Sequence, residues 1–259
     1  MNKKPIGIFD SGVGGSSIWK EIHKLLPNEH TIYLADSKFA PYGPKGPDKI
    51  KELSVKNVEL LLSKECKLIV VACNTATTNA IDYLRSHYDI PFVGIEPAIK
   101  PAALKTKTKI VGILATKGTL SSTLFHKTAN LYGHNILKIE QEGEGIVQLI
   151  ESGNLYSVEM TYLLKNYLEP MIKANIDYLV LGCTHYSYLI PILKELLPKH
   201  IRIVDSGQSV ARQVKSVLQT NQLLNVKPTF GRNEFFTNDN PDVLTSLLGN
   251  NFNVGFLDF

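Results

Sequence analysis

Short apolar segments rich in β-branched residues alternate along this chain with longer amphipathic segments. The apolar segments that we expect to form strands are residues 6–10, 31–36, 68–73, 91–96, 109–116, 135–140, 178–183 and 201–205. Helical patterns lie between them, for example at 47–66, 120–132, 157–174 and 207–218. This alternation is typical of an α/β fold with mainly parallel sheets, whose strands are near-continuously apolar because both of their faces are buried.

The two halves of the chain repeat one plan. The segments KLIVVACN (67–74) and DYLVLGCT (177–184) each read as an apolar strand, a cysteine at its carboxyl end, and small polar residues that open a helix. Upstream, IFDSGVGGSS (8–17) and ILATKGTLSS (113–122) share a second layout, a strand followed by a polar turn and a helix start. The spacing between the members of each pair nearly agrees, so the register of the repeat holds.

We therefore predict two pseudo-symmetric α/β lobes, each a mainly parallel sheet flanked by helices. The first lobe covers residues 1–95 together with 207–259, because roughly 50 C-terminal residues are too few to form a lobe alone. The second lobe covers residues 96–206. Ligands of open α/β sheets bind beyond the carboxyl ends of the strands, so we expect the active site in the cleft between the lobes.

Composition and charge argue against several classes of protein. Hydrophobic residues make up 44% of the 259 residues and charged residues 20%, which is an ordinary globular mixture. No apolar run is long enough to span a membrane, and the N-terminal apolar stretch, 6–9, is too short for a signal peptide. The net charge of +4 comes from scattered lysines. We expect a cytoplasmic protein with neither a membrane nor a nucleic acid as partner.

Polar residues gather where the expected strands end. The groups are Asp10 with Ser11, Asp36 with Ser37 and the nearby 41–43, then 73–75, Thr116, and 183–185. Carboxyl ends of parallel strands meet at one edge of a sheet, so each lobe carries its polar groups on one rim. If the two rims face each other, they enclose a single cleft.

The three cysteines do not form a disulfide framework or a CxxC motif. Cys66 has no polar signature and is expected to be a small buried hydrophobe. Cys73 and Cys183 each precede a helix, whose N-terminus is expected to lower the pKa of the thiol. Two such thiols facing each other across a cleft suit one reaction: a thiolate removes a proton from carbon, and the other thiol returns a proton to the opposite face. The pair would titrate as a coupled unit.

A glycine-rich loop at 12–17 leaves a different class of function open. It nearly matches GxGxxG, and Asp36 ends the next strand, as in a dinucleotide-binding fingerprint. Ser17 replaces the third glycine, and Asp10 stands where a pyrophosphate would sit. The alternatives are a nucleotide- or phosphate-binding protein, a tight turn that starts a helix, or a site where Asp10 meets an ammonium or a proton in transit. A thiol redox protein is a further alternative, against which the absence of CxxC counts.

Seven motifs together resemble the glutamate racemases within the Asp/Glu racemase superfamily. They are FDSGVGG (9–15), ADSKFAPYG (35–43), VACNTA (71–76), VGIEP (93–97), LATKGT (114–119), LGCTHY (181–186) and VDSG (204–207). The resemblance implies a racemase without cofactor or metal that interconverts L- and D-glutamate and supplies D-glutamate for peptidoglycan, hence for cell wall biogenesis and cell shape. Its partner is the small-molecule substrate, and a homodimer is expected because the family is often dimeric. An aspartate racemase is the alternative within the superfamily.

The resemblance also assigns roles. Cys73 and Cys183 match the two catalytic bases, Cys73 acting on D-glutamate and Cys183 on L-glutamate, while Asp10 and His185 match helpers of the thiols. Glu151, in QLIESG (148–153), is either a third helper or a solvated carboxylate at a helix end. The residues that map to substrate contacts are Asp10, Ser11, Pro41, Tyr42, Gly43, Asn74, Thr75, Thr116, Thr119, Thr184 and His185.

A few positions depart from the family pattern. Ala35 stands in place of a glycine, Phe39 in place of a common arginine, and Ser187 where a proline often occurs. The VGIEP segment is one residue shorter than the common form. We expect these changes to affect cleft closure or dimer contacts. Outside the motifs, Trp19 is expected in the core or an interface, and the histidines at 23, 30, 87, 126, 134 and 200 are expected to be ordinary polar residues.

Overall fold

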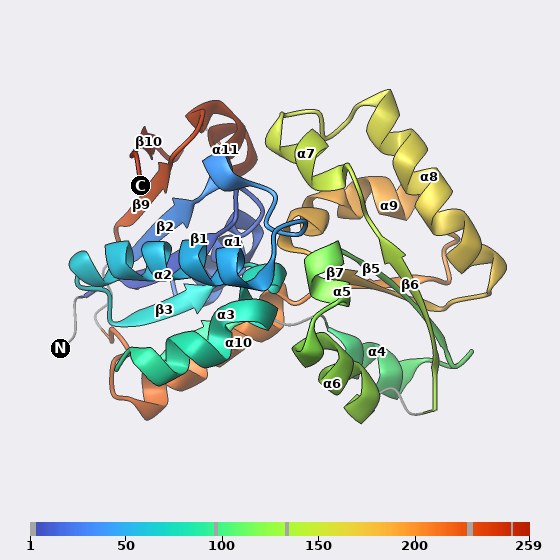
Figure 1. The fold of residues 1–259 in the computed structure, drawn as a ribbon, viewed down its shortest axis with the longest axis horizontal. Coiled ribbons are helices and arrows are strands. Elements are labelled where there is room, and N and C mark those ends of the chain that lie inside the picture. Colours follow the sequence, from blue (N-terminus) through green and yellow to red (C-terminus); the bar gives the residue numbers. More distant parts are fainter. Residues whose placement is uncertain (1–3, 96–97, 133–134, 227–229, 250) are drawn as a thin grey trace.

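Figure 1 shows a computed structural model of the chain, which contains two parallel β-sheets side by side, each flanked by helices. The structure describes residues 4–95, 98–132, 135–226, 230–249 and 251–259. The end of the VGIEP motif (96–97), the end of the expected strand 91–96 and His134 lie outside the described residues.

Every strand pairing is parallel, which confirms the expected fold class. The six-stranded sheet has the order β10-β9-β2-β1-β3-β4, with β1 Ile6–Asp10, β2 Thr31–Ala35, β3 Leu68–Val71, β4 Phe92–Gly94, β9 Asn233–Thr237 and β10 Val254–Phe256. The four-stranded sheet has the order β6-β5-β7-β8, with β5 Ile110–Ala115, β6 Leu137–Glu142, β7 Tyr178–Gly182 and β8 Arg202–Val204. The order β2-β1-β3-β4 recurs as β6-β5-β7-β8, as the sequence repeat predicts.

Helices connect the strands. Around the six-stranded sheet they are α1 Ser16–Leu25, α2 Pro47–Ser63, α3 Asn74–His87, α10 Gly207–Thr220 and α11 Pro241–Leu248. The others are α4 Ile99–Lys105, α5 Lys117–Leu120, α6 Thr123–Tyr132, α7 Ile146–Glu151, α8 Val158–Lys173 and α9 Ile190–Leu196, with 3₁₀ helices η1 Ser37–Phe39 and η2 Thr184–Leu189. Within the described part of the chain, no helix combines the length and the apolar character that a bilayer crossing requires.

The structure corrects several expected boundaries. Several observed strands end earlier than expected. Strand β3 ends before Cys73, whose side chain accepts the Ala76 N–H and caps the start of α3. The expected helix 120–132 is broken, because the Ser122 hydroxyl accepts the Phe125 N–H and starts a new helix there. The strand expected at 135–140 is shifted to β6. Strands β9 and β10 and helix α11 were not anticipated.

The cores form as the apolar patterns predict. Strands β1, β2, β3 and β7 are buried at every residue. Trp19 is 2% exposed and packs edge-on against Phe235 and Phe252, which places it in the core. Cys66 is also buried, and burial raises the pKa of its thiol to about 12, as suits a hydrophobic residue without chemistry.

A buried ion pair ties the amino end of β3 to the rest of the six-stranded sheet. Lys67 Nζ donates to Glu29 Oε2 at 2.6 Å and to the Leu223 carbonyl at 2.8 Å. The other Glu29 oxygen accepts the Asn225 N–H at 2.7 Å. Both side chains are almost fully buried, so neither charge is solvated by water. The pair therefore joins three chain segments that lie far apart in sequence.

Replacing Lys67 by methionine should destabilise the protein by about 3–5 kcal/mol, because Glu29 is left as an uncompensated buried charge. The double variant K67M/E29Q should recover a large part of this loss, since glutamine is neutral and can still accept the Asn225 N–H. Urea unfolding of both variants measures the difference. Equal stability of K67M and K67M/E29Q would contradict the assignment of the loss to the stranded carboxylate.

Candidate active site

The carboxyl edges of the two sheets enclose one small cavity. Its free volume is about 10 Å³, room for roughly one water molecule. Most of the expected site residues line it, namely Ser11, Pro41, Tyr42, Gly43, Cys73, Asn74, Thr75, Thr116, Cys183 and His185. Asp10, Glu151 and Thr119 do not line the cavity but contact residues that do, and Thr184, which also does not line it, donates to Asp10. The structure thus brings together groups from both halves of the chain.

Cys73 lies between one donor and one acceptor. Its sulfur accepts the Ala76 N–H at 3.4 Å, and its S–H donates to the Ser11 hydroxyl at 3.4 Å. Burial raises the pKa of the thiol well above its usual range, and the nearby Asp10 charge adds to this rise. The expected lowering by the helix start is therefore wrong for Cys73. The N–H bond does act in the lowering direction, but full burial disfavours the thiolate more strongly.

Cys183 faces a histidine that a carboxylate orients. The Cys183 sulfur lies 3.7 Å from His185 Nδ1, and His185 Nε2 donates to Glu151 Oε1 at 2.5 Å. Burial alone lowers the pKa of His185, but its hydrogen bonds with Cys183 and Glu151 outweigh burial, so the pKa is raised well above the usual range. These two partners therefore favour the protonated form of the imidazole. A short 3₁₀ helix follows Cys183, without the side-chain cap that Cys73 provides to α3.

Glu151 is not a solvated helix-end carboxylate. Its Oε1 also accepts the Val13 N–H at 2.7 Å, and its Oε2 accepts the Ser37 hydroxyl at 2.8 Å. Its side chain is only 14% exposed. Glu151 ends α7, next to the four-stranded sheet, whereas Val13 lies in the loop after β1 and Ser37 begins η1, both beside the six-stranded sheet. The carboxylate therefore joins the two sides of the cleft.

Asp10 is the buried carboxylate at the back of the site. It accepts the Gly15 N–H at 2.6 Å and the Thr184 hydroxyl at 3.4 Å, and it lies 4.0 Å from His185 Nδ1. Burial raises the pKa of Asp10 to about 6, and the charge of His185 limits that rise. Ser11, whose hydroxyl donates to Asp10 at 3.4 Å, accepts the S–H of Cys73 and so links the carboxylate to the thiol. Asp10 can therefore exchange a proton near neutral pH beside a thiol.

The glycine-rich loop makes room for these groups. A Cβ atom at Gly12 would lie 1.9 Å from a Glu151 oxygen, and one at Gly14 would lie 2.2 Å from His185 Nδ1. The N–H groups that a phosphate would need point instead at protein side chains, those of Val13 and Gly15 at carboxylates. This arrangement disfavours the dinucleotide interpretation and explains the glycines by close approach.

One buried donor without a partner and a cluster of threonine hydroxyls lie at or beside the cavity. Asn74 is only 3% exposed, and its side-chain nitrogen has no hydrogen-bond partner among the described residues. Across the cleft the hydroxyls of Thr75 and Thr116 lie 2.8 Å apart, and Thr119 lies 3.1 Å from Thr116. Buried donors normally have a hydrogen-bond acceptor. This set of donors is therefore suited to binding the carboxylate of a ligand.

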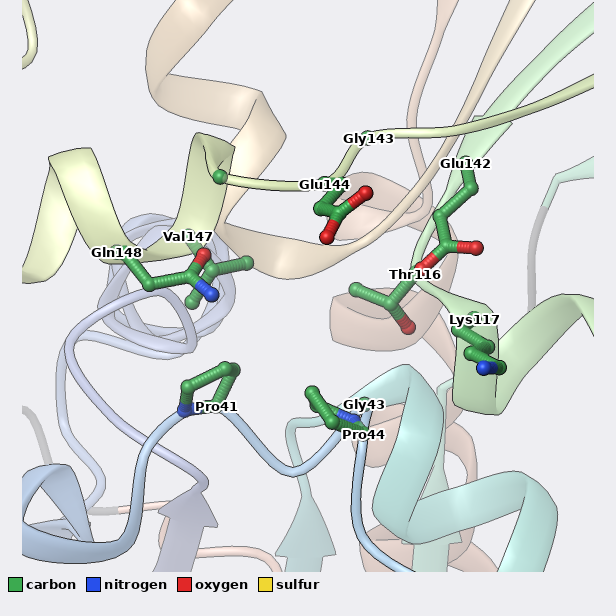
Figure 2. Close-up of a pocket in the computed structure, with 11 residues that line it drawn as sticks. Pro41, Gly43, Pro44, Thr116, Lys117, Glu142, Gly143, Glu144, Val147 and Gln148 are labelled. Atoms are coloured by element: carbon green, nitrogen blue, oxygen red, sulfur yellow. The ribbon is translucent and has the colours of Figure 1, made fainter.

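A second cavity of about 150 Å³ covers the first. It shares Pro41, Gly43, Thr116 and Val147 with the small cavity and lies between the 41–44 loop and the segment around the start of α7 (Figure 2). Sequence reasoning missed Val147 and the further residues that line this cavity, Pro44, Lys117, Glu142, Gly143, Glu144, Gly145 and Gln148. The signal that could have found them was the carboxyl end of β6, which we expected two residues too early. This cavity adjoins the small one through the residues that the two share.

The departures from the family pattern lie beside the site. Ala35 is a fully buried residue at the end of β2. Phe39 places its ring 4.4 Å from the ammonium of Lys56. Ser187 donates to Asp205 at 3.1 Å. None of these residues contacts a thiol of the cavity.

Within the described ranges, no three His, Cys, Asp or Glu side chains are arranged to hold a metal ion. The arrangement instead offers acid–base groups around one small cavity: two thiols, a carboxylate whose pKa burial raises to about 6, and an imidazole whose partners raise its pKa. Groups of this kind suit proton transfer to and from carbon.

Comparison with known proteins identifies the family. The Asp/Glu/Hydantoin racemase family model matches residues 6–214. The glutamate racemase of Herpetosiphon aurantiacus is 42% identical over 93% of this chain and 95% of its own length. The solved glutamate racemase isoform RacE1 from Bacillus anthracis has a TM-score of 0.89 at 29% identity, covering 100% of this chain and 98% of that one.

A solved structure from Escherichia coli adds bound molecules to the comparison. It is glutamate racemase in complex with L-glutamate and the activator UDP-MurNAc-ala, with a TM-score of 0.84 at 35% identity, covering 95% of this chain and 94% of that one. The family model, the identity along nearly the whole chain and the shared fold agree. The chain therefore belongs to the Asp/Glu/Hydantoin racemase family and is an amino-acid racemase.

Proposed function

We propose that the protein interconverts L- and D-glutamate by proton transfer between the substrate α-carbon and two cysteines, without a cofactor. The observation that carries this proposal is the presence of Cys73 and Cys183 in the wall of one buried cavity. The names of the similar relatives support glutamate as the substrate. The unpartnered Asn74 donor and the threonine hydroxyls at 75 and 116 supply contacts for its carboxylates.

In the proposed reaction one sulfur is a thiolate and the other a thiol. The thiolate takes the α-proton, which leaves the electron pair on the α-carbon and its carboxylate, and the opposite thiol then gives its proton to the other face. The two sulfurs exchange protonation states and the configuration inverts, so no net proton is consumed. Cys73 removes the proton of D-glutamate and Cys183 that of L-glutamate.

Asp10, His185 and Glu151 serve the thiols in this proposal. Asp10 accepts the proton of Cys73 when that sulfur must become a thiolate, a role that matches its raised pKa of about 6. The charged His185 stabilises negative charge on Cys183 through Nδ1, and Glu151 holds the ring in place from Nε2. Each base therefore has its own partner, as matched acid–base pairs in a desolvated site require.

Substrate entry requires the cleft to open. A cavity of about 10 Å³ cannot hold an amino acid, and contacts such as Val13 to Glu151 cross the cleft. We therefore propose that residues 1–95 with 207–259 move as one lobe against 96–206. We also propose that the enzyme is a cytoplasmic homodimer that supplies D-glutamate for peptidoglycan; the family resemblance supports these assignments.

Replacing either cysteine by serine should lower racemisation by at least about a thousandfold, because a hydroxyl is a far weaker acid than a thiol. C73S should still exchange the α-proton of L-glutamate with deuterated solvent, and C183S that of D-glutamate. Proton NMR in D₂O measures the exchange of each enantiomer. Near-normal turnover in either variant, or equal loss for both enantiomers in both variants, would contradict separate bases on opposite faces.

Circular dichroism of D-glutamate, incubated with reduced protein and no added cofactor, should decay to zero. L-Aspartate run in parallel should keep its signal; faster decay of aspartate would reassign the substrate within the family. A third arm measures thermal unfolding with NAD, ATP or glutamate. Stabilisation by a nucleotide but not by glutamate would support the phosphate-binding alternative.

The variant Asp10→Asn tests two properties of this carboxyl group, its contribution to racemisation and its effect on the pH dependence of stability. A pKa raised from 3.8 to about 6 means that wild-type protein loses stability as the pH rises through that interval. Between pH 4 and pH 7.5 the loss is about 2 kcal/mol, and D10N, which does not titrate, should escape it. Racemisation should fall at least about tenfold. Urea unfolding at both pH values tests this; parallel pH dependences of the two proteins would refute it.

A further inference from the structure

A carboxylate that does not line the cavity organises the wall of the site. Asp36 is fully buried, and four donors surround it. Lys56 Nζ and Asn238 Nδ2 donate to Oδ1 at 2.7 and 2.6 Å, while Asn57 Nδ2 at 3.1 Å and the Tyr42 hydroxyl donate to Oδ2. Lys56 is the positively charged donor of the four. Its side chain is 30% exposed, whereas that of Asp36 is 0% exposed.

The same donors hold the C-terminal segment, residues 257–259. Lys56 Nζ donates to the main-chain oxygen of Phe259 at 3.1 Å, and Asn238 Nδ2 donates to it at 3.0 Å. The Lys56 ammonium also lies 4.4 Å from the ring of Phe39 and 5.1 Å from that of Phe259. Asn238 Oδ1 accepts the Lys38 N–H at 3.0 Å. Helix α2, the end of β9, the C-terminal segment and the loop after β2 thus meet at one carboxylate.

This loop, 37–43, forms one side of both cavities. Pro41, Tyr42 and Gly43 line the small cavity, and Gly43 lies against Gly118 of α5 on the opposite side of the cleft. A Cβ at Gly118 would come within 3.0 Å of the Gly43 oxygen, so the loop closes onto α5 without spare space. A small displacement of the loop would therefore change the wall that faces the thiols.

We propose that Lys56 is a positioning residue for substrate binding, which fixes Tyr42 and the 37–43 loop through Asp36. The proposal rests on the proposed racemisation of glutamate. A buried carboxylate needs a compensating charge, and Lys56 is the cation that donates to Asp36. Without it, Asp36 gains water only by moving outward, and the Tyr42 hydroxyl that donates to it moves too. Lys56 itself touches neither the cavity nor the thiols.

Lys56→Met tests the proposal, because methionine keeps the packing on the two phenylalanine rings and removes the ammonium. The KM for glutamate should rise about tenfold, the value of one charge-assisted hydrogen bond, with kcat changed less than about threefold. Lys56→Arg keeps a cation and should restore KM to within about twofold. The matched control is Lys51→Met on the same helix, which should behave as wild type. Among the described residues, the Lys51 ammonium contacts the exposed Asp48 and the Tyr83 ring.

A variant of Asn238 and a measurement of amide hydrogen exchange test the proposal without relying on the fold of one variant or on the racemisation reaction. Asn238→Ala should raise KM similarly, and K56M/N238A should raise it no further, because both residues act through Asp36. Amide hydrogen exchange over 37–45 should accelerate at least about tenfold in K56M and remain slow in K56R and K51M. Loss of kcat and of melting temperature at unchanged KM, or slow exchange in K56M, would overturn the proposal. Wild-type protein that racemises no glutamate would overturn the proposed function alone, since hydrogen exchange still tests the role of Lys56.

Discussion

The structure depends on placing titratable groups where water does not reach them. Asp10 and His185 are buried to within 1% of full burial, and Cys73 is 5% exposed. A charge that is buried in this way needs a polar or charged partner. Each thiol of the site has such a neighbour. Asp10 stands by Cys73, and His185 by Cys183 with Glu151 behind it. The unusual pKa values of the site, raised for Asp10, Cys73 and His185, follow from this burial and from these neighbours.

The parallel sheets make this arrangement possible. Strands β3 and β7 hold equivalent positions in their sheets, so the cysteines that follow them reach the same cavity from opposite sides. At Gly12 and Gly14 the loop after β1 has no side chain, which allows Glu151 and His185 to come within contact of its backbone. Further out, Asp36 and Lys56 support the loop that forms the wall. Rigidity at the thiols thus comes from elements that do not touch them.

Much of the fold and of the cavity wall could be predicted from the sequence. The strands around Cys73 and Cys183 are apolar on both faces, and the repeat predicted the shared strand order. Strands β9 and β10 were missed because they are short, half-buried and of mixed polarity, so their pairing depends on β2. The role of Glu151 could not be settled, because its partners Val13 and Ser37 lie more than a hundred residues away. The direction of the Cys73 pKa was wrong because burial is a property of the whole fold.

The contacts of Glu151 have a consequence for the period when the cleft is open. Glu151 and His185 come from one side of the cleft, while Val13, Ser37 and Asp10 come from the other. In the opening that we propose, separating the sides breaks these contacts and admits water, so the raised pKa values of Asp10, Cys73 and His185 belong to the shut site. The shut cleft both disfavours the reactive thiolate of Cys73 and covers its sulfur. Oxidants and electrophiles of the cell therefore reach the sulfur only while the cleft is open.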